Sequence, residues 1–381
     1  MSLEALRQEI DQIDSDLLQV FERRMDTVAK IQAVKEKEGL PVLDRTRERE
    51  KLRALAEKAR PEFAPYAHIL YDTLFELSRS HQIEQGSLDS ALAAAISGAI
   101  EHTPKLFPQS ATVAVQGVAG AFSQIAAERL FQRPHLQHFK TFDNVFSAIE
   151  NGFCQYGVLP LENSTAGSVT KIYNLMQSRN FKIIRSVRVK VDHNLVTKKG
   201  VKLEEIREIF SHEQALSQCA GYLEQFGSQV KITAVENTAA AAEAVANSDR
   251  KDVAAICSWA CVGLYDLACI ARDIQDRSNN YTRFICISKN LEIYPGADKT
   301  SIMLVLPHKP GALYKALARF YALGINLNKL ESRPLPDRDF EFMFYFDLET
   351  SVYSQEFMKL LAGLEEICDE FKYLGSYNEV I

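Results

Sequence analysis

The sequence predicts a multidomain protein with an all-α N-terminal segment, an α/β domain and a small α+β domain at its C-terminal end. Its 381 residues suffice for two to three domains that each bury a core. Apolar residues recur at helical spacing in residues 1–83, short β-rich runs alternate with helical stretches from 111 to 289, and residues 296–381 follow a β-α-β-β-α-β pattern. We therefore expect domains over 1–85, 110–290 and 296–381, with a linker over 86–109.

The N-terminal segment is predicted to form three helices. The first is amphipathic, with its apolar stripe at Leu3, Ile10, Leu17, Phe21, Val28 and Ile31. Gly39 and Pro41 end it, and Asp44 can cap a second helix that stops before Pro61. A third helix fits residues 65–83.

The rest of the chain has three parts that differ in their residue patterns. Residues 86–109 are small and polar with an Ala-rich patch, which is typical of a linker that can hold a short helix. The runs TVAVQG, YGVLPL, EEIFS, KITAVE and VAAIC alternate with helical stretches, and this indicates an α/β fold with largely parallel strands. The final pattern predicts a ferredoxin-like split βαβ unit.

Composition excludes several classes of function. The net charge of −6 offers no general attraction for nucleic acid, and the first residues lack the apolar run of a signal peptide. The apolar stretch 253–271 contains Asp266, so we expect a buried strand and a core-facing helix there, not a membrane span. The seven cysteines lack zinc spacing and favour reduced, buried thiols. We expect a cytoplasmic protein with no metal and no cofactor.

Three cations lie in the apolar seam of the first helix: Arg7, Arg24 and Lys35. Each could extend to solvent or pair with an acid, but the three together favour an anionic ligand. Arg7 and Arg24 are about 26 Å apart on a straight helix. One small ligand contacts both only if Arg7 comes from a second chain. This geometry predicts a helical dimer whose sites are completed across the interface, with a ligand that carries more than one anionic group.

These residues bring a family resemblance with them. The segment resembles the all-helical chorismate mutases at Arg7, Arg23, Arg24, Lys35, Asp44, Arg47, Glu48, Ser78 and Gln82. The resemblance implies an intertwined dimer that binds chorismate. In this resemblance the two carboxylates are bound by Arg7 of the partner subunit, Arg24 and Arg47. The catalytic residues are Lys35 and Gln82, which donate to the ether oxygen as its bond breaks. The substrate hydroxyl and its neighbouring groups are contacted by Asp44, Glu48 and Ser78. A pericyclic rearrangement needs no nucleophile, so cations and amide donors are suitable groups.

The α/β region has polar residues where its strands lead into helices. They are Gln116–Ser123, Glu162–Gly167, Ser211–Gln214, Glu236–Thr238 and Cys257–Ser258. Each could be an ordinary helix cap, but together they would form a pocket of N–H and O–H donors if the strand ends converge. The glycines at 117 and 120 lack the full dinucleotide fingerprint, so NAD is not expected.

The strings LPLENSTAG, SHEQALSQC and NNYTRF are more specific and resemble prephenate dehydratase from about residue 111 to 289. The resemblance implies two α/β lobes around a cleft, as in periplasmic binding proteins, and loss of water and carbon dioxide from prephenate without a metal. It implies that Thr282 is the catalytic residue that positions the leaving hydroxyl. The implied prephenate-binding residues are Glu162, Asn163, Ser164, Thr165, His212, Gln214, Thr282 and Arg283.

Some of these roles stay open. Arg283 could orient a carboxylate or brace its loop, and His212 could titrate near neutrality or only begin a helix. Val118 and Glu213 stand where relatives of the dehydratase often have proline, which affects local loop shape and removes no reactive group.

The C-terminal unit carries two short motifs. Gly311-Ala312-Leu313 begins its first helix, and Glu331-Ser332-Arg333-Pro334 ends its second strand. Separately they are typical of helix capping and of an edge strand closed by proline. Together they resemble the ACT domain of phenylalanine-inhibited dehydratases. The resemblance implies that Gly311, Ala312, Leu313, Glu331, Ser332 and Arg333 bind L-phenylalanine as an end-product inhibitor.

Nearly the whole chain outside the linker thus resembles the bifunctional chorismate mutase/prephenate dehydratases, or P-proteins. The implied activity is rearrangement of chorismate and conversion of prephenate to phenylpyruvate in a homodimer or higher homo-oligomer. The alternatives are an arogenate-preferring dehydratase with the same domains, a non-catalytic amino-acid-binding regulator, and a helical segment kept only for dimerisation. The complete sets Lys35/Gln82 and Thr282/Arg283 argue against the regulator. A helical segment kept only for dimerisation should have lost some of its cations, and none is missing.

Overall fold

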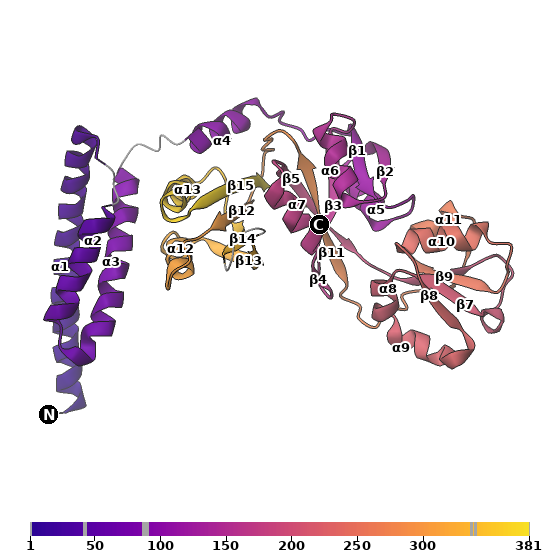
Figure 1. Cartoon of the computed structure of the whole chain (residues 1–381), viewed down its shortest axis with the longest axis horizontal. Coiled ribbons are helices and arrows are strands. Elements are labelled where there is room, and N and C mark those ends of the chain that lie inside the picture. Colours follow the sequence, from indigo (N-terminus) through magenta and orange to yellow (C-terminus); the bar gives the residue numbers. More distant parts are fainter. Residues whose placement is uncertain (1, 41–43, 86–90, 336–337, 339–340, 381) are drawn as a thin grey trace. The chain divides into compact units, whose positions relative to one another are not determined.

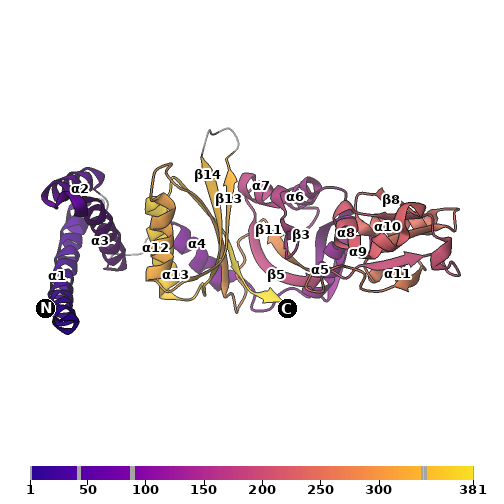
Figure 2. The same ribbon diagram turned by 90° about the horizontal axis from the view of Figure 1, so that it is seen from below.

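The computed structural model describes residues 2–40, 44–85, 91–335, 338 and 341–380. It divides into two compact units. Figures 1 and 2 label its helices and strands. The first unit contains residues 1–97 and 302–372, and the second contains residues 98–301 and 373–381. Among the described residues, no helix is long and apolar enough to span a membrane.

The first unit begins with the three helices expected from the sequence. They are α1 (Leu3–Glu38), α2 (Arg45–Lys58) and α3 (Ala64–Gln85), with a 3-10 turn at Pro61–Phe63 before α3. Ser2 caps α1, and Gly39 ends it in the left-handed conformation with φ of +64°. The Asp44 side chain caps α2, as predicted. In Figure 1, α3 runs alongside both α1 and α2.

Much of the apolar surface of α1 is uncovered in a single chain. Only Val28 and Gln32 are buried along its 36 residues. The exposed apolar side chains are Leu3, Leu6, Ile10, Ile13, Leu17, Leu18, Val20, Ile31 and Val34. A stripe of this length is unusual on the surface of a monomer.

The β-α-β-β-α-β order expected near the C-terminus is present. Its elements are β12 (Lys299–Val305), α12 (Ala312–Ala322), β13 (Asn326–Pro334), β14 (Phe342–Glu349), α13 (Gln355–Ile367) and β15 (Glu370–Tyr377). The strand order is β13-β14-β12-β15, and α12 and α13 lie on the same face of the sheet (Figure 2). This is the order of a split βαβ unit, and it leaves β13 at an edge.

The second unit contains a seven-stranded sheet with the order β16-β5-β11-β3-β1-β2, in which β4 also pairs with β3. Its strands are β1 (Ser110–Gln116), β2 (Arg133–Phe139), β3 (Tyr156–Asn163), β4 (Gly167–Ser168), β5 (Lys182–Lys190), β11 (Tyr281–Ser288) and β16 (Glu379–Val380). Its helices are α5 (Phe122–Leu130), α6 (Phe142–Glu150) and α7 (Thr170–Ser178). The helix α4 (Ala91–His102) occupies part of the expected linker and contains the boundary between the two units, which lies between residues 97 and 98.

A five-stranded sheet with the order β10-β6-β9-β7-β8 completes this unit. Its strands are β6 (Asn194–Thr197), β7 (Glu208–Ser211), β8 (Lys231–Ala234), β9 (Val253–Cys257) and β10 (Ala268–Ala271). The associated helices are α8 (Glu213–Gln218), α9 (Ala220–Leu223), α10 (Thr238–Asn247) and α11 (Ala260–Leu264), with 3-10 turns at Leu203–Glu205 and Glu224–Gln229. Each sheet has its own buried apolar cluster.

The expectation of largely parallel strands is wrong, because both sheets are mixed. Strand β11 runs antiparallel to β3 and β5, and β6 runs antiparallel to β9 and β10. The chain leaves the large sheet after β5 and returns to it only at β11, so β11 enters between strands already in place. This return brings residues 280–284 beside the end of β3.

Candidate active sites

A cavity of about 680 Å³ lies among the helices α1, α2 and α3. It gathers seven of the eight residues predicted to bind chorismate: Arg24, Lys35, Asp44, Arg47, Glu48, Ser78 and Gln82. The eighth, Arg7, does not line this cavity and is exposed near the other end of α1, where Glu4 is 4.0 Å away. One chain therefore assembles a site that is polycationic but lacks Arg7.

Local hydrogen bonds hold several of the side chains that line this cavity in place. Asp44 accepts a hydrogen bond from the Arg47 backbone N–H at 3.0 Å, and this cap places Arg47 and Glu48 in the first turn of α2. Arg24 donates to the Ser78 hydroxyl and to the Leu74 carbonyl, the latter at 3.2 Å. These contacts tie α1 to α3 beside the cavity. Burial lowers the pKa of Arg24.

Arg79 is a cavity residue that the sequence reading missed. Its side chain is 6% exposed and forms ion pairs with Glu48 on α2 and Glu76 on α3. Burial alone would lower the pKa of Arg79, but the two carboxylates raise it above its ordinary value. The spacing of Arg79 three residues after Glu76 is a weak signal, because such pairs are common on exposed helix faces. Arg79 holds Glu48, a predicted substrate ligand, in position.

Arg79→Met is expected to lower mutase kcat/KM about tenfold or more, because Glu48 loses the buried cation that orients it. Arg79→Lys retains the positive charge and should keep most of the activity. Steady-state kinetics with chorismate measures both variants, and dehydratase activity reports whether the rest of the chain is intact. Equal activities for Arg79→Met and the wild type would contradict this role.

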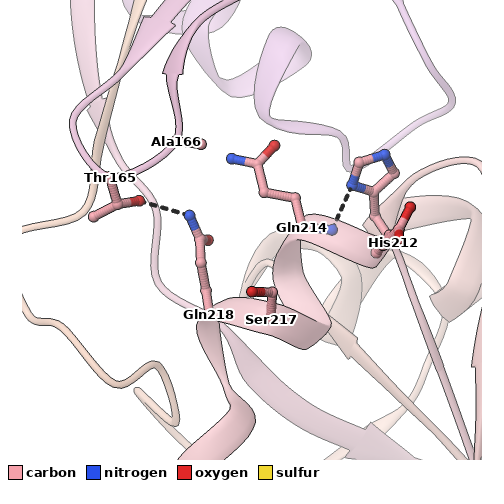
Figure 3. Close-up of a pocket in the computed structure, with 7 residues that line it drawn as sticks. Thr165, Ala166, His212, Gln214, Ser217 and Gln218 are labelled. Atoms are coloured by element: carbon pink, nitrogen blue, oxygen red, sulfur yellow. Dashed lines mark hydrogen bonds between the residues drawn. The ribbon is translucent and has the colours of Figure 1, made fainter.

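A second cavity, of about 410 Å³, lies in the α/β unit. Its lining comes from elements of both sheets and includes the predicted residues Asn163, His212, Gln214 and Thr282. The predicted residue Thr165 lines an adjoining hollow of about 470 Å³ together with His212 and Gln214 (Figure 3). The strand ends therefore do converge on polar side chains.

The remaining predicted residues lie beside these cavities and do not line either of them. Arg283 is buried and its Nε is 2.7 Å from Glu162 Oε1, so the pair joins β11 to β3. Ser164 donates to the Asn279 carbonyl at 2.8 Å and accepts from the Tyr281 N–H at 2.9 Å. Of the two roles left open for Arg283, these contacts favour bracing.

Thr282 is held by Asn163. The Asn163 amide donates to the Thr282 hydroxyl oxygen at 2.9 Å and to the Asn280 side-chain oxygen at 2.8 Å. Asn163 is itself oriented because its Oδ1 accepts from the backbone N–H groups of Thr165 and Ala166, at 3.0 and 2.9 Å. Since the Thr282 oxygen accepts from Asn163, its own O–H can donate elsewhere.

His212 and Gln214 begin α8 (Figure 3). The His212 ring nitrogen Nδ1 accepts from the Gln214 N–H at 3.3 Å, so the histidine has the structural helix-start role that the sequence left open, and it also lines both cavities. Gln218, one turn later, donates to Thr165 Oγ1 at 2.7 Å. Gln218 and Asn280 were missed as site residues although they stand in the quoted strings SHEQALSQC and NNYTRF.

His193 was also missed, because it lies in no recognised motif. It is 2% exposed, lines the second cavity, and places Nε2 2.9 Å from Gln218 Oε1. Burial lowers the pKa of His193 below its ordinary value, partly offset by the Gln218 hydrogen bond and by Asp192. Its imidazole is therefore kept neutral.

The predicted effector residues lie at two places in the C-terminal βαββαβ unit. Gly311 precedes α12 in the left-handed conformation with φ of +82°, followed by Ala312 and Leu313 in the first turn. Glu331, Ser332 and Arg333 lie on the edge strand β13, where Arg333 pairs with Glu331 at 2.7 Å. No cluster of His, Cys, Asp or Glu that could hold a metal occurs in the described part of the chain.

Comparisons with known proteins agree with the division of the chain into a helical N-terminal segment and an α/β domain. The family model "Chorismate mutase type II" matches residues 6–83, and the model "Prephenate dehydratase" matches residues 113–292. The bifunctional chorismate mutase/prephenate dehydratase of Aquifex aeolicus is 31% identical over 100% of this chain and 98% of its own. The chain belongs to the bifunctional chorismate mutase/prephenate dehydratase family. Its activities are those of phenylalanine biosynthesis: chorismate to prephenate, and prephenate to phenylpyruvate.

Two further proteins, both named as dehydratases, match about 70% of this chain. Arogenate dehydratase 2 of Petunia hybrida is 38% identical over 70% of this chain and 71% of its own. The structure of prephenate dehydratase from Arthrobacter aurescens, described as a complex with L-Phe, is 29% identical and matches with a TM-score of 0.65. It covers 70% of this chain and 90% of that one.

Proposed function

We propose that chorismate rearranges in the cavity of α1, α2 and α3 and that prephenate is dehydrated in the cavity lined by Thr282. The observation that carries the first assignment is the convergence of Arg24, Lys35 and Arg47 with the amide of Gln82 in one cavity. The second rests on the neighbouring positions of Asn163 and Thr282, which come from strands distant in the sequence.

In the mutase site, the cations bind the two carboxylates of chorismate and hold the compact conformer. Lys35 and Gln82 donate to the ether oxygen, on which negative charge develops as its bond to carbon breaks. Asp44, Glu48 and Ser78 contact the hydroxyl and its neighbours. Rate acceleration comes from orientation and from stabilisation of that developing charge.

The mutase site is completed by a second copy of the chain. The uncovered apolar stripe of α1 includes Leu3, Ile10 and Leu17, and Arg7 projects from the same helix far from the cavity of its own chain. Burying the stripe against a second α1 places each Arg7 near the partner's site. This arrangement supports a homodimer with shared sites, and higher assemblies can be built from it.

A mixture of Arg7→Ala and Lys35→Met chains tests the shared site. Each variant alone is expected to be nearly inactive as a mutase. After equimolar denaturation and refolding, a mixed dimer contains one site with both residues intact, so about a quarter of the wild-type mutase activity should return. No recovery, with mixed dimers shown by native mass spectrometry, would contradict a site shared between chains.

In the dehydratase site, Thr282 donates a hydrogen bond to the ring hydroxyl of prephenate. The bond from the ring to its carboxylate breaks and releases carbon dioxide, and that electron pair aromatises the ring and expels the hydroxyl as hydroxide. Hydroxide takes up one proton, ultimately from solvent, and leaves as water. Asn163, Thr165, His212 and Gln214 bind the substrate, while Glu162, Ser164 and Arg283 shape the wall around it.

The cleft belongs to a two-lobed fold of the kind found in periplasmic binding proteins. Support comes from two sheets with separate apolar clusters and a cavity lined by residues of both. We assign the mutase domain to 1–85, a linker to 86–109, the dehydratase to 110–290 and the regulatory domain to 296–381. The pairing of β16 with β5 means that the last residues also belong to the large sheet.

The C-terminal βαββαβ unit is an ACT domain that binds L-phenylalanine. Its strand order, the left-handed Gly311 and the edge position of Ser332 support this, as does the relative described as a complex with L-Phe. Phenylalanine stabilises a state with a less competent cleft. A coupling free energy of about 1–3 kcal/mol suffices.

Gly311→Ala is expected to raise the phenylalanine concentration for half-inhibition of the dehydratase at least about tenfold, with uninhibited activity unchanged. The new Cβ meets no atom of the described residues within 4 Å, but it disfavours the left-handed conformation by about 1–2 kcal/mol. Gly324→Ala is the matched control, since Gly324 is also left-handed and unobstructed but lies outside the motif. Ser332→Ala should also lose inhibition. Unchanged inhibition of the Gly311 and Ser332 variants would contradict the effector site.

An arogenate-preferring dehydratase is the second candidate, favoured by the 38% identity to the petunia enzyme. The two substrates differ only in the side chain, where arogenate has an amine and prephenate a ketone. Comparison of kcat/KM for the two decides between them: a higher value with prephenate supports the P-protein assignment, and a higher value with arogenate supports the alternative.

A further inference from the structure

His193 lies next to the hydrogen-bond network that holds Thr282. It lines the same cavity as Thr282 and is 2% exposed. Its Nδ1 is buried and has no hydrogen-bond partner among the residues that the structure describes. A buried polar atom without a partner is rare in folded proteins, and a catalytic role or a bound water is among its known explanations. The question is whether Nδ1 donates or accepts.

The network fixes the positions of the protons, starting from two backbone groups. The N–H groups of Thr165 and Ala166 can only donate, so the atom of Asn163 that they contact is its oxygen, Oδ1. The other end of the Asn163 side chain is therefore the NH₂ group. It donates to Asn280 at 2.8 Å, so the atom of Asn280 that it contacts is Oδ1.

The hydrogen-bond network continues from Asn280 to His193. The Asn280 amide nitrogen donates to Gln218 Oε1 at 3.0 Å, and that oxygen also lies 2.9 Å from His193 Nε2. Because Oε1 only accepts, Nε2 carries the proton. Burial lowers the pKa of His193, so the ring is neutral and Nδ1 presents a bare lone pair.

We propose that His193 Nδ1 accepts the hydrogen of the substrate's ring hydroxyl, so that His193 is a further substrate-contacting residue of the dehydratase. Prephenate at neutral pH carries two carboxylates and a ketone, which only accept, and its one hydrogen-bond donor is that hydroxyl. A lone pair repels carboxylates, so the orientation in which the hydroxyl faces His193 is favoured.

This contact gives His193 a positioning role. When the hydroxyl hydrogen is directed at Nδ1, the oxygen lone pairs are free to accept from the Thr282 O–H. His193 thus fixes the rotation of the leaving group, and Thr282 stabilises the charge that develops when the bond to carbon breaks. The inference rests on the proposed placement of prephenate in this cavity.

Two substitutions test the contributions of the two His193 ring nitrogens separately. His193→Gln places an amide near the Nε2 position, retaining a partner for Gln218 and removing the acceptor at Nδ1. His193→Asn places an amide near Nδ1 and loses the contact with Gln218. We expect His193→Gln to lower dehydratase kcat/KM about 10- to 100-fold, and His193→Asn to retain more activity. Mutase activity of the same preparations verifies that the chain is intact.

A second readout is inhibition by phenylpyruvate, the product, which lacks the ring hydroxyl. Its inhibition constant should stay within about twofold of wild type in His193→Gln. Near-wild-type kcat/KM for His193→Gln, or weakened phenylpyruvate inhibition alongside lost activity, would overturn the inference. Thr282→Val assayed in parallel separates the two proposals. If Thr282→Val is impaired and His193→Gln is not, only the histidine inference fails; if neither is impaired, the placement of prephenate fails.

Discussion

Thr282→Val is expected to lower dehydratase kcat about 10²- to 10³-fold while mutase activity stays at the wild-type level. Valine has nearly the shape of threonine but lacks the O–H that stabilises the leaving oxygen. The hydroxyl oxygen accepts from Asn163 at 2.9 Å, so its hydrogen is available to the substrate. Steady-state kinetics with prephenate and with chorismate measures the two activities on one preparation.

Thr282→Ser is the matched control, because serine retains the hydroxyl and loses only a methyl group. It should keep activity within about tenfold of the wild type. Equal losses in the valine and serine variants would mean that packing of the methyl group, and not the hydroxyl, is what the reaction requires.

Lys35→Met is expected to lower mutase kcat/KM about 10³-fold or more and to leave dehydratase activity unchanged. Lys35 lines the mutase cavity near the end of α1, and methionine removes the charge while keeping a flexible apolar side chain of similar length. The loss is large because the ammonium acts on charge that exists mainly in the transition state.

Lys37→Met is the control for Lys35→Met, since Lys37 is in the same helical turn, exposed and outside the cavity. It should have wild-type mutase kinetics. Comparable losses in both variants would indicate that the overall charge of the helix end attracts chorismate, and would count against a specific contact from Lys35.

The mutase cavity was the part of the molecule that could be predicted best from the sequence, because helical geometry is local. A period of 3.6 residues puts Arg7, Arg24 and Lys35 on one stripe of α1, and the Asp44 cap puts Arg47 and Glu48 in the first turn of α2. That the two helices meet at one site was implied by the resemblance to the chorismate mutases. Arg7 could be recognised as a residue for a second chain from helical geometry: it lies 17 positions before Arg24 in the helix, too far for one small ligand to contact both.

The dehydratase cavity was harder to predict from the sequence because it depends on strand pairing. Thr282 lies beside Asn163 only because β11 returns to the large sheet and pairs antiparallel with β3, and no local pattern specifies that return. His193 had no signal of its own, since a buried histidine after a strand is ordinarily a core residue. Arg79 was hidden among the many charges of the helical segment, and only its burial distinguishes it.

The central claim is that one chain holds two separate active sites that act in succession. The most direct measurement is the amount of chorismate, prephenate and phenylpyruvate after incubation with chorismate at neutral pH. The reaction is not quenched with acid, because acid itself converts prephenate to phenylpyruvate. The wild type should form phenylpyruvate, Thr282→Val should accumulate prephenate, and Lys35→Met should leave chorismate unchanged yet still consume added prephenate. Phenylpyruvate formed from chorismate by Thr282→Val at the wild-type rate, or failure of Lys35→Met to consume prephenate, would contradict the account.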